Sequence, residues 1–169
     1  MSLLERRRNT PSFNRRALLL GALGLGACGF TPVYGPDGAG TALRGRVEVQ
    51  APTTESGYLM TRQLEQRLGR AATPRFALDM GLSTSSEGLA VNTEGDIERF
   101  NLIGAAAYSL RDLETGAVVT SGEVNQFTAY SATGTTVATL AAERDALERL
   151  MVILADQIVA RLFTSDIPA

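Results

Sequence analysis

The stretch RFNLIGAAAYSL, residues 99–110, alternates between two kinds of side chain along its length. One set is apolar and mostly large: Phe100, Leu102, Ala106, Tyr108 and Leu110. The other set is mostly small: Asn101, Ile103, Ala105, Ala107 and Ser109. Because side chains of a β-strand point alternately to the two faces of a sheet, this stretch predicts a strand with one face on a core and a second face of small groups.

Three further segments predict strands around it. Residues 43–51 (LRGRVEVQA) alternate cleanly, and residues 76–83 place Phe76, Leu78, Met80 and Leu82 on one face. A polar, bulge-like segment, 84–88, then precedes Leu89 and Val91, where the strand can resume. Residues 117–130 form a fourth, weaker pattern. Residues 92–96 (NTEGD) and 112–116 (DLETG) have the composition of turns.

Two segments instead repeat with the period of a helix. Met60, Leu64 and Leu68 form one apolar stripe, with Thr54 or Ser56 as the N-cap and Gly69 as the C-cap. A second helix begins after a cap at Thr135 or Thr136 and extends to about residue 163. Its stripe contains Leu140, Leu147, Met151, Leu154, Ile158 and Leu162, broadened by Leu150 and Ile153. Both stripes indicate packing on the apolar face of the sheet.

The order of elements is therefore β-α-β-β-β-α. We expect an α+β fold, a two-layer sandwich in which two helices cover one face of a four-stranded, mostly antiparallel sheet. The partner and direction of the first strand stay open, because a helical crossover can place it parallel to its neighbour. The expected domain spans residues 43–163, and residues 164–169 form a C-terminal tail.

The N-terminus predicts export and lipidation. Residues 1–27 contain five arginines followed by eleven uncharged residues (17–27), too short a run to cross a bilayer as a helix, and this order is typical of a signal peptide. The sequence Leu25-Gly26-Ala27-Cys28 resembles the lipobox of bacterial lipoproteins, which implies cleavage between Ala27 and Cys28 and acylation of the Cys28 thiol. Multiple acyl chains would hold the chain durably in a membrane. Residues 28–42 would form the lipidated N-terminus and a flexible tether.

Two features of the N-terminal region concern the export route and the destination membrane. Arg15-Arg16 leaves both general secretion and twin-arginine export open. Gly29, which stands where an aspartate would cause retention in the inner membrane, favours the outer membrane by resemblance to the sorting rule of Gram-negative lipoproteins.

Composition argues against several classes of function. The 142 residues after Ala27 carry eleven arginines and 17 acidic residues, so their net charge of −6 disfavours nucleic-acid binding. The chain has no histidine or lysine and one cysteine, which removes His-based triads and His/Cys metal sites. We therefore expect no cofactor, no metal and no enzymatic activity. Asp79, Asp96 and Glu98 show no paired-carboxylate spacing that would support a hydrolase.

Taken together, the segments resemble a known family. Residues 25–35 (LGACGFTPVYG), 99–130 and 141–162 are similar in order and spacing to LptE-type lipopolysaccharide-assembly lipoproteins of alphaproteobacteria, and the resemblance covers most of residues 25–163. It implies a non-enzymatic plug inside the LptD β-barrel of the outer membrane, facing the periplasm. Such a protein aids folding of the barrel and delivery of lipopolysaccharide to the outer leaflet. It also implies contact with lipopolysaccharide, whose phosphates suit arginine.

Residues for these contacts are only partly indicated. The small groups Gly81, Ser83, Ala105, Ala107 and Ser109 would let another surface approach the outward face of the sheet. Five arginines lie on or beside strands, and each can bind phosphate or pair with an acid such as Glu98 or Asp112: Arg44, Arg46, Arg75, Arg99 and Arg111. The alternative function is an envelope lipoprotein that acts as a scaffold or binds a small ligand.

Overall fold

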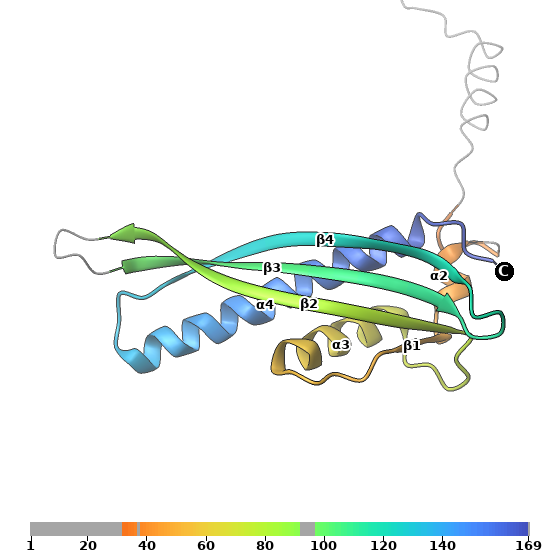
Figure 1. Ribbon diagram of the computed structural model, residues 1–169, viewed down its shortest axis with the longest axis horizontal. Coiled ribbons are helices and arrows are strands. Elements are labelled where there is room, and N and C mark those ends of the chain that lie inside the picture. The colour runs from red at the N-terminus through yellow and green to blue at the C-terminus, as the bar shows by residue number, and fades with distance from the viewer. Residues whose placement is uncertain (1–31, 37, 92–96, 169) are drawn as a thin grey trace, which may run out of the picture. The chain divides into compact units, whose positions relative to one another are not determined.

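A four-stranded sheet forms one layer of the fold (Figure 1). The computed structural model describes residues 32–36, 38–91 and 97–168. The strands are β1 (Val47–Val49), β2 (Phe76–Val91), β3 (Ile97–Asp112) and β4 (Val118–Ser131), in the spatial order β1-β2-β3-β4. β2, β3 and β4 are antiparallel, whereas β1 is parallel to β2, so the sheet is mixed and not the mostly antiparallel sheet that the sequence predicts. The helix between β1 and β2 provides the crossover that a parallel pair requires.

Two helices form the second layer, as the sequence predicts. They are α3 (Glu55–Leu68) and α4 (Thr136–Phe163). Thr54 caps α3 by accepting a hydrogen bond from the Gly57 N–H at 3.0 Å, and Thr135 caps α4 by accepting one from the Ala138 N–H at 3.3 Å. Gly69, with φ of 78°, ends α3. The α+β class and the order β-α-β-β-β-α are confirmed.

The core lies between the helices and the face of β3 that carries Leu102, Ala106, Tyr108 and Leu110. The helices contribute the buried side chains Met60, Leu64, Leu68, Leu150, Met151, Leu154, Ile158 and Leu162. Arg62 pairs with Glu148 and Arg67 with Asp156, which joins α3 to α4 at the surface. Leu140 and Ile153 of the predicted stripe are exposed, whereas Ala146, Ala155 and Val159, which lie outside that stripe, are buried.

The chain before β1 differs from the sequence prediction. The sequence predicts a tether over residues 28–42 and a strand that starts at Leu43, but Ala39–Leu43 form the short helix α2 and Leu43 is fully buried in the core. Residues 28–31 and 37 of the predicted tether lie outside the described residues. Gly45, with φ of 68°, then turns the chain into the short strand β1. Burial of the Leu43 side chain in the core stabilises α2. The Gly- and Thr-rich composition of this segment does not by itself predict a helix.

The polar segment 84–88 is the second difference. It is not a bulge but a regular part of β2, with Thr84 opposite Gly104 and Ser86 opposite Leu102. The irregularity comes later, at Leu89, between the paired residues Gly88 and Ala90. The composition of this segment favours a loop, but its pairing with β3, whose side chains alternate clearly, makes it part of the strand. The predicted turn at 92–96 lies outside the described residues.

Candidate interaction surface

The face of the sheet opposite the helices is open in the described part of the chain. We call it the outer face. The five small residues expected there do lie on it, and the register places Gly81 opposite Ala107 and Ser83 opposite Ala105. Gly81, Ser83 and Ala107 are exposed, and a Cβ added at Gly81 would meet no atom within 4 Å. The outer face therefore has a band of small side chains, which a second surface can approach closely.

An apolar patch continues this outer face. Ile103 of β3 lies opposite Phe127 of β4, and the Phe127 side chain is 61% exposed. Together with Asn101, Asn125 and Gln126 they line an open depression of about 350 Å³. Sequence reasoning missed Phe127, because the alternation of β4 is weak. In the structure Val124 and Thr128 are buried, and Phe127 lies at an odd position between them, so its side chain points to the opposite face of the sheet.

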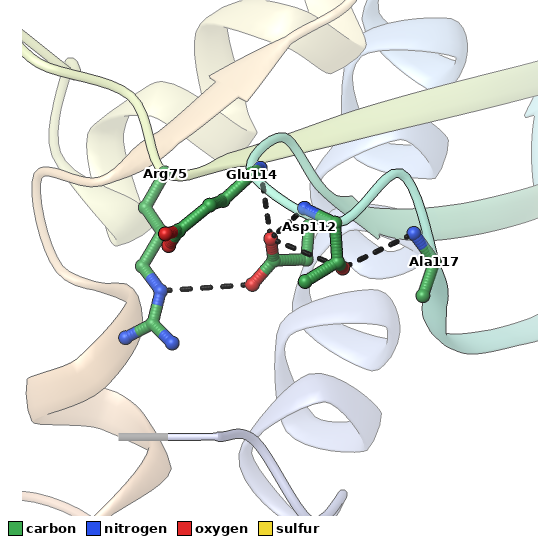
Figure 2. Close-up of polar contacts among 5 residues, drawn as sticks. Arg75, Asp112, Glu114 and Ala117 are labelled. Atoms are coloured by element: carbon green, nitrogen blue, oxygen red, sulfur yellow. Dashed lines mark hydrogen bonds and ion pairs between the residues drawn. The ribbon is translucent and has the colours of Figure 1, made fainter.

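A buried carboxylate organises the turn between β3 and β4 (Figure 2). Asp112 Oδ1 accepts hydrogen bonds from the N–H groups of Glu114 at 2.9 Å and Thr115 at 3.0 Å, and from the Thr115 hydroxyl at 3.3 Å. Arg75 Nε lies 3.7 Å from Asp112 Oδ2. The Thr115 N–H bond is the largest cause that lowers the pKa of Asp112, with the other hydrogen bonds and Arg75 acting in the same direction. The turn predicted at 112–116 is thus held by its first residue.

The strand-borne arginines do not share one environment. Arg75 forms an ion pair with Asp112, one of the two acidic partners that the sequence indicates. Its guanidinium also lies over the Phe76 ring, with Cζ 5.1 Å from the ring centroid. Arg111 instead bonds Asp79 across the β2–β3 pair at 2.7 Å. Arg44, Arg46 and Arg99 are exposed and form no ion pair within the described residues.

The carboxylates considered for a hydrolase are not brought together. Asp79 is occupied by Arg111, Glu98 is exposed, and Asp96 lies outside the described residues. In the described segments no three His, Cys, Asp or Glu side chains gather as a metal site would require. Nor does any helix there have the length and apolar character to cross a membrane. Ala27 and Cys28, the predicted cleavage and lipidation site, also lie outside the described residues.

Comparison with known proteins gives a family match and several similar folds. The family model described as "LptE: Lipopolysaccharide-assembly" matches residues 45–162, well over half of the chain. A protein described as a lipoprotein from Caulobacter crescentus has a TM-score of 0.64 and 23% identity, over 75% of this chain and 93% of that chain. Rare lipoprotein B from Shewanella oneidensis has a TM-score of 0.54 and 13% identity, over 69% and 91%.

A third solved structure, lipoprotein B from Nitrosomonas europaea, has a TM-score of 0.54 and 17% identity, over 71% of this chain and 83% of that chain. At these identities the structures show a common fold. No curated protein sequence matches the chain significantly.

Proposed function

Since this chain belongs to the LptE family of lipopolysaccharide-assembly proteins, we propose that it is an outer-membrane lipoprotein that forms a complex with the LptD β-barrel. In this role it assists assembly of the barrel and delivery of lipopolysaccharide to the outer leaflet. The observation that carries the proposal is the family match over residues 45–162, which spans β1 to the end of α4. The open outer face supports it, because a domain that works inside a barrel needs a surface that the barrel wall can approach.

The length of chain before the fold supports a position close to the membrane. Tyr34, six residues after Cys28, packs edge-on against Phe163 of α4, with ring centroids 5.7 Å apart. Six residues span about 22 Å at most, so acyl chains on Cys28 would hold the domain near the bilayer. A partner in or at the same membrane fits this position.

Purification from detergent-solubilised outer membranes tests the complex. We expect the wild-type chain, carrying an affinity tag after Ala169, to recover the LptD barrel in about equal amount. A preparation without LptD would contradict the proposed function and leave the scaffold or small-ligand interpretation.

A second experiment tests the anchor separately. The Cys28→Ala variant should accumulate as an unprocessed precursor without acyl chains, measured by mass spectrometry of the intact chain. An unchanged mass relative to a lipidated wild type, apart from the substitution itself, would contradict lipidation at Cys28.

A further inference from the structure

The described residues before β1, 32–36 and 38–43, are attached to the domain, and we call them the N-terminal clamp. Tyr34 lies edge-on against Phe163, the last residue of α4, with ring centroids 5.7 Å apart. At the other end of the clamp the Leu43 side chain is fully buried in the core. The clamp is therefore held at two points before β1 begins.

Close backbone packing makes the clamp compact. The Gly40 N–H donates to the Val33 carbonyl at 2.9 Å. A Cβ at Gly38 would overlap the Val33 carbonyl oxygen and lie 2.5 Å from that of Pro32. Gly38 has a φ of −81° and a ψ of 142°, which any residue adopts. The contact with residues 32 and 33, and not the backbone conformation, thus requires a glycine at position 38.

The clamp lies at the same end of the domain as the turn between β3 and β4 (Figure 1). The Arg46 carbonyl, three residues after the clamp, accepts from the Arg75 N–H at 2.9 Å. The Arg75 carbonyl in turn accepts from the N–H of Leu113, in that turn, at 2.8 Å. Beyond α4, the Ser165 hydroxyl donates to Thr120 Oγ1 of β4 at 3.2 Å. We call this end, formed by the clamp, the β3–β4 turn and the C-terminal end of α4, the clamp end.

The length of chain after Cys28 limits how far the clamp end can lie from the acyl chains. Tyr34 follows Cys28 by six residues, which span about 22 Å at most. The opposite end of the domain is free of this limit, because α4 has 28 residues and is about 42 Å long. With the clamp closed, the clamp end stays close to the bilayer while the first turn of α4 can project away from it.

Exposed apolar side chains at the clamp end suit the boundary of a bilayer. The Tyr34 side chain is 64% exposed although its ring touches Phe163, and Leu113 is 46% exposed. Tyrosine is frequent at membrane–water interfaces, because it combines an apolar ring with a polar hydroxyl. The same end has exposed charges of both signs, among them Arg44 and Glu114. Contact with the bilayer should therefore not require anionic lipid.

We propose that the N-terminal clamp is a positioning element that fixes the lipid anchor at one end of the domain, so that the clamp end faces the phospholipid bilayer. This inference rests on the lipid anchor of the proposed function and adds the orientation. With the clamp open, the first attachment would be Leu43, fifteen residues after Cys28, and the chain between them spans up to about 54 Å. Either end of the domain could then approach the bilayer. A fixed orientation lowers the entropy that is lost when a partner in the same membrane binds.

Energy transfer from the two ends of the domain to labelled lipid tests the orientation. The chain has one cysteine, Cys28, which acylation would occupy, so an introduced cysteine carries the fluorescent donor alone. Glu114→Cys labels the clamp end and Val137→Cys labels the first turn of α4, and both positions are exposed. The lipidated chain is placed in phosphatidylcholine vesicles that contain an acceptor lipid. We expect transfer from position 114 to be at least about twofold greater than from position 137, because about 39 Å of helix separates the two ends.

Valine at two glycines tests the clamp itself. Gly38→Val should open the clamp and make the transfer from the two labelled positions about equal. Gly81→Val is the matched control and should keep the difference, since a Cβ there meets no atom within 4 Å. Circular dichroism checks that both variants fold. A folded Gly38→Val chain that keeps the full difference overturns the role of the clamp.

A second pair of variants keeps the inference testable where valine at position 38 disturbs the fold. Tyr34→Ala removes the ring that contacts Phe163 and should reduce the difference in transfer, while the largely exposed position leaves the core intact. Tyr34→Phe keeps the ring and should preserve the difference. Identical transfer in these two variants would count against the clamp as the positioning element.

The outcomes separate this inference from the proposed function. A wild-type chain that does not bind the vesicles contradicts the lipid anchor, and the inference is lost with it. A chain that binds the vesicles but gives equal transfer from positions 114 and 137 overturns the orientation alone. Recovery of LptD is measured on the unlabelled wild type, so the complex is tested independently of both.

Discussion

At the scale of the residue, Asp112 shows how one side chain positions two elements. Its carboxylate holds the turn that leads from β3 to β4, and it also pairs with Arg75 at the start of β2 (Figure 2). The Arg75 carbonyl in addition accepts from the Leu113 N–H at 2.8 Å, so backbone and side chain link the same two segments. Because these partners stabilise the ionised carboxylate, they lower the pKa of Asp112.

This lowered pKa predicts how stability depends on pH. A depressed carboxylate contributes stability that is fully present above the unfolded-state pKa of about 3.9 and is lost as the pH falls through the lower folded-state value. We expect Asp112→Asn to be less stable than wild type by a constant amount between about pH 7 and pH 5, and the difference to shrink below about pH 4. Urea unfolding across this range measures it, and a difference unchanged at about pH 2 would contradict the assignment.

At the scale of the element, Gly104 sets how closely α4 packs on the sheet. A Cβ at this position would lie 2.9 Å from Leu150 Cδ2 and 3.0 Å from Leu154 Cδ1. Both leucines are fully buried in the middle of α4. The absence of a side chain in the central strand β3 therefore lets the helix lie directly against it.

Substitution of this glycine should overpack the core. We expect Gly104→Val to lower the free energy of unfolding by about 1–3 kcal/mol, because the buried leucines must move. Gly81→Val is the matched control, since a Cβ there meets no atom within 4 Å and a β-branched residue suits a strand. Denaturant unfolding of the two variants compares them. Equal effects at both positions would show that strand propensity, and not the contact with α4, determines the result.

At the scale of the whole molecule, the two faces of the sheet differ in what covers them. The helices cover one face and bury the core, while the described chain leaves the outer face open from Gly81 to Phe127. Its small residues and the exposed side chain of Phe127 suit contact with a large, shape-complementary surface.

A bulky charge on the outer face should therefore impair the proposed complex with LptD without unfolding the domain. We expect Ala107→Arg to reduce the LptD recovered by affinity purification at least about fivefold, because an arginine in the band of small residues separates the two surfaces. Ala160→Arg, on an exposed position of α4, should leave recovery unchanged. If both variants recover LptD at the wild-type level, the outer face is not the contact surface.

Local patterns were sufficient for most of the elements. The alternation of residues 99–110 and the apolar stripe of Met60, Leu64 and Leu68 each lie within one segment. They can therefore be recognised without knowing which other segments pack against them. The caps at Thr54, Thr135 and Gly69 are local for the same reason, since each bonds groups three or four residues away. Lipidation of Cys28 stays a prediction from its sequence context.

The rest needed the tertiary structure, because it depends on residues distant in the chain. The sequence by itself determined the α+β class, the order β-α-β-β-β-α from β1 to α4 and the two faces of β3, since these follow from periodicity and capping along the chain. Only the tertiary structure decided the parallel pairing of β1, the burial of Leu43 and the place of the polar segment 84–88 in the sheet. Each of these follows from which surfaces meet in space, and hydrophobic burial and strand pairing between remote segments leave no local pattern.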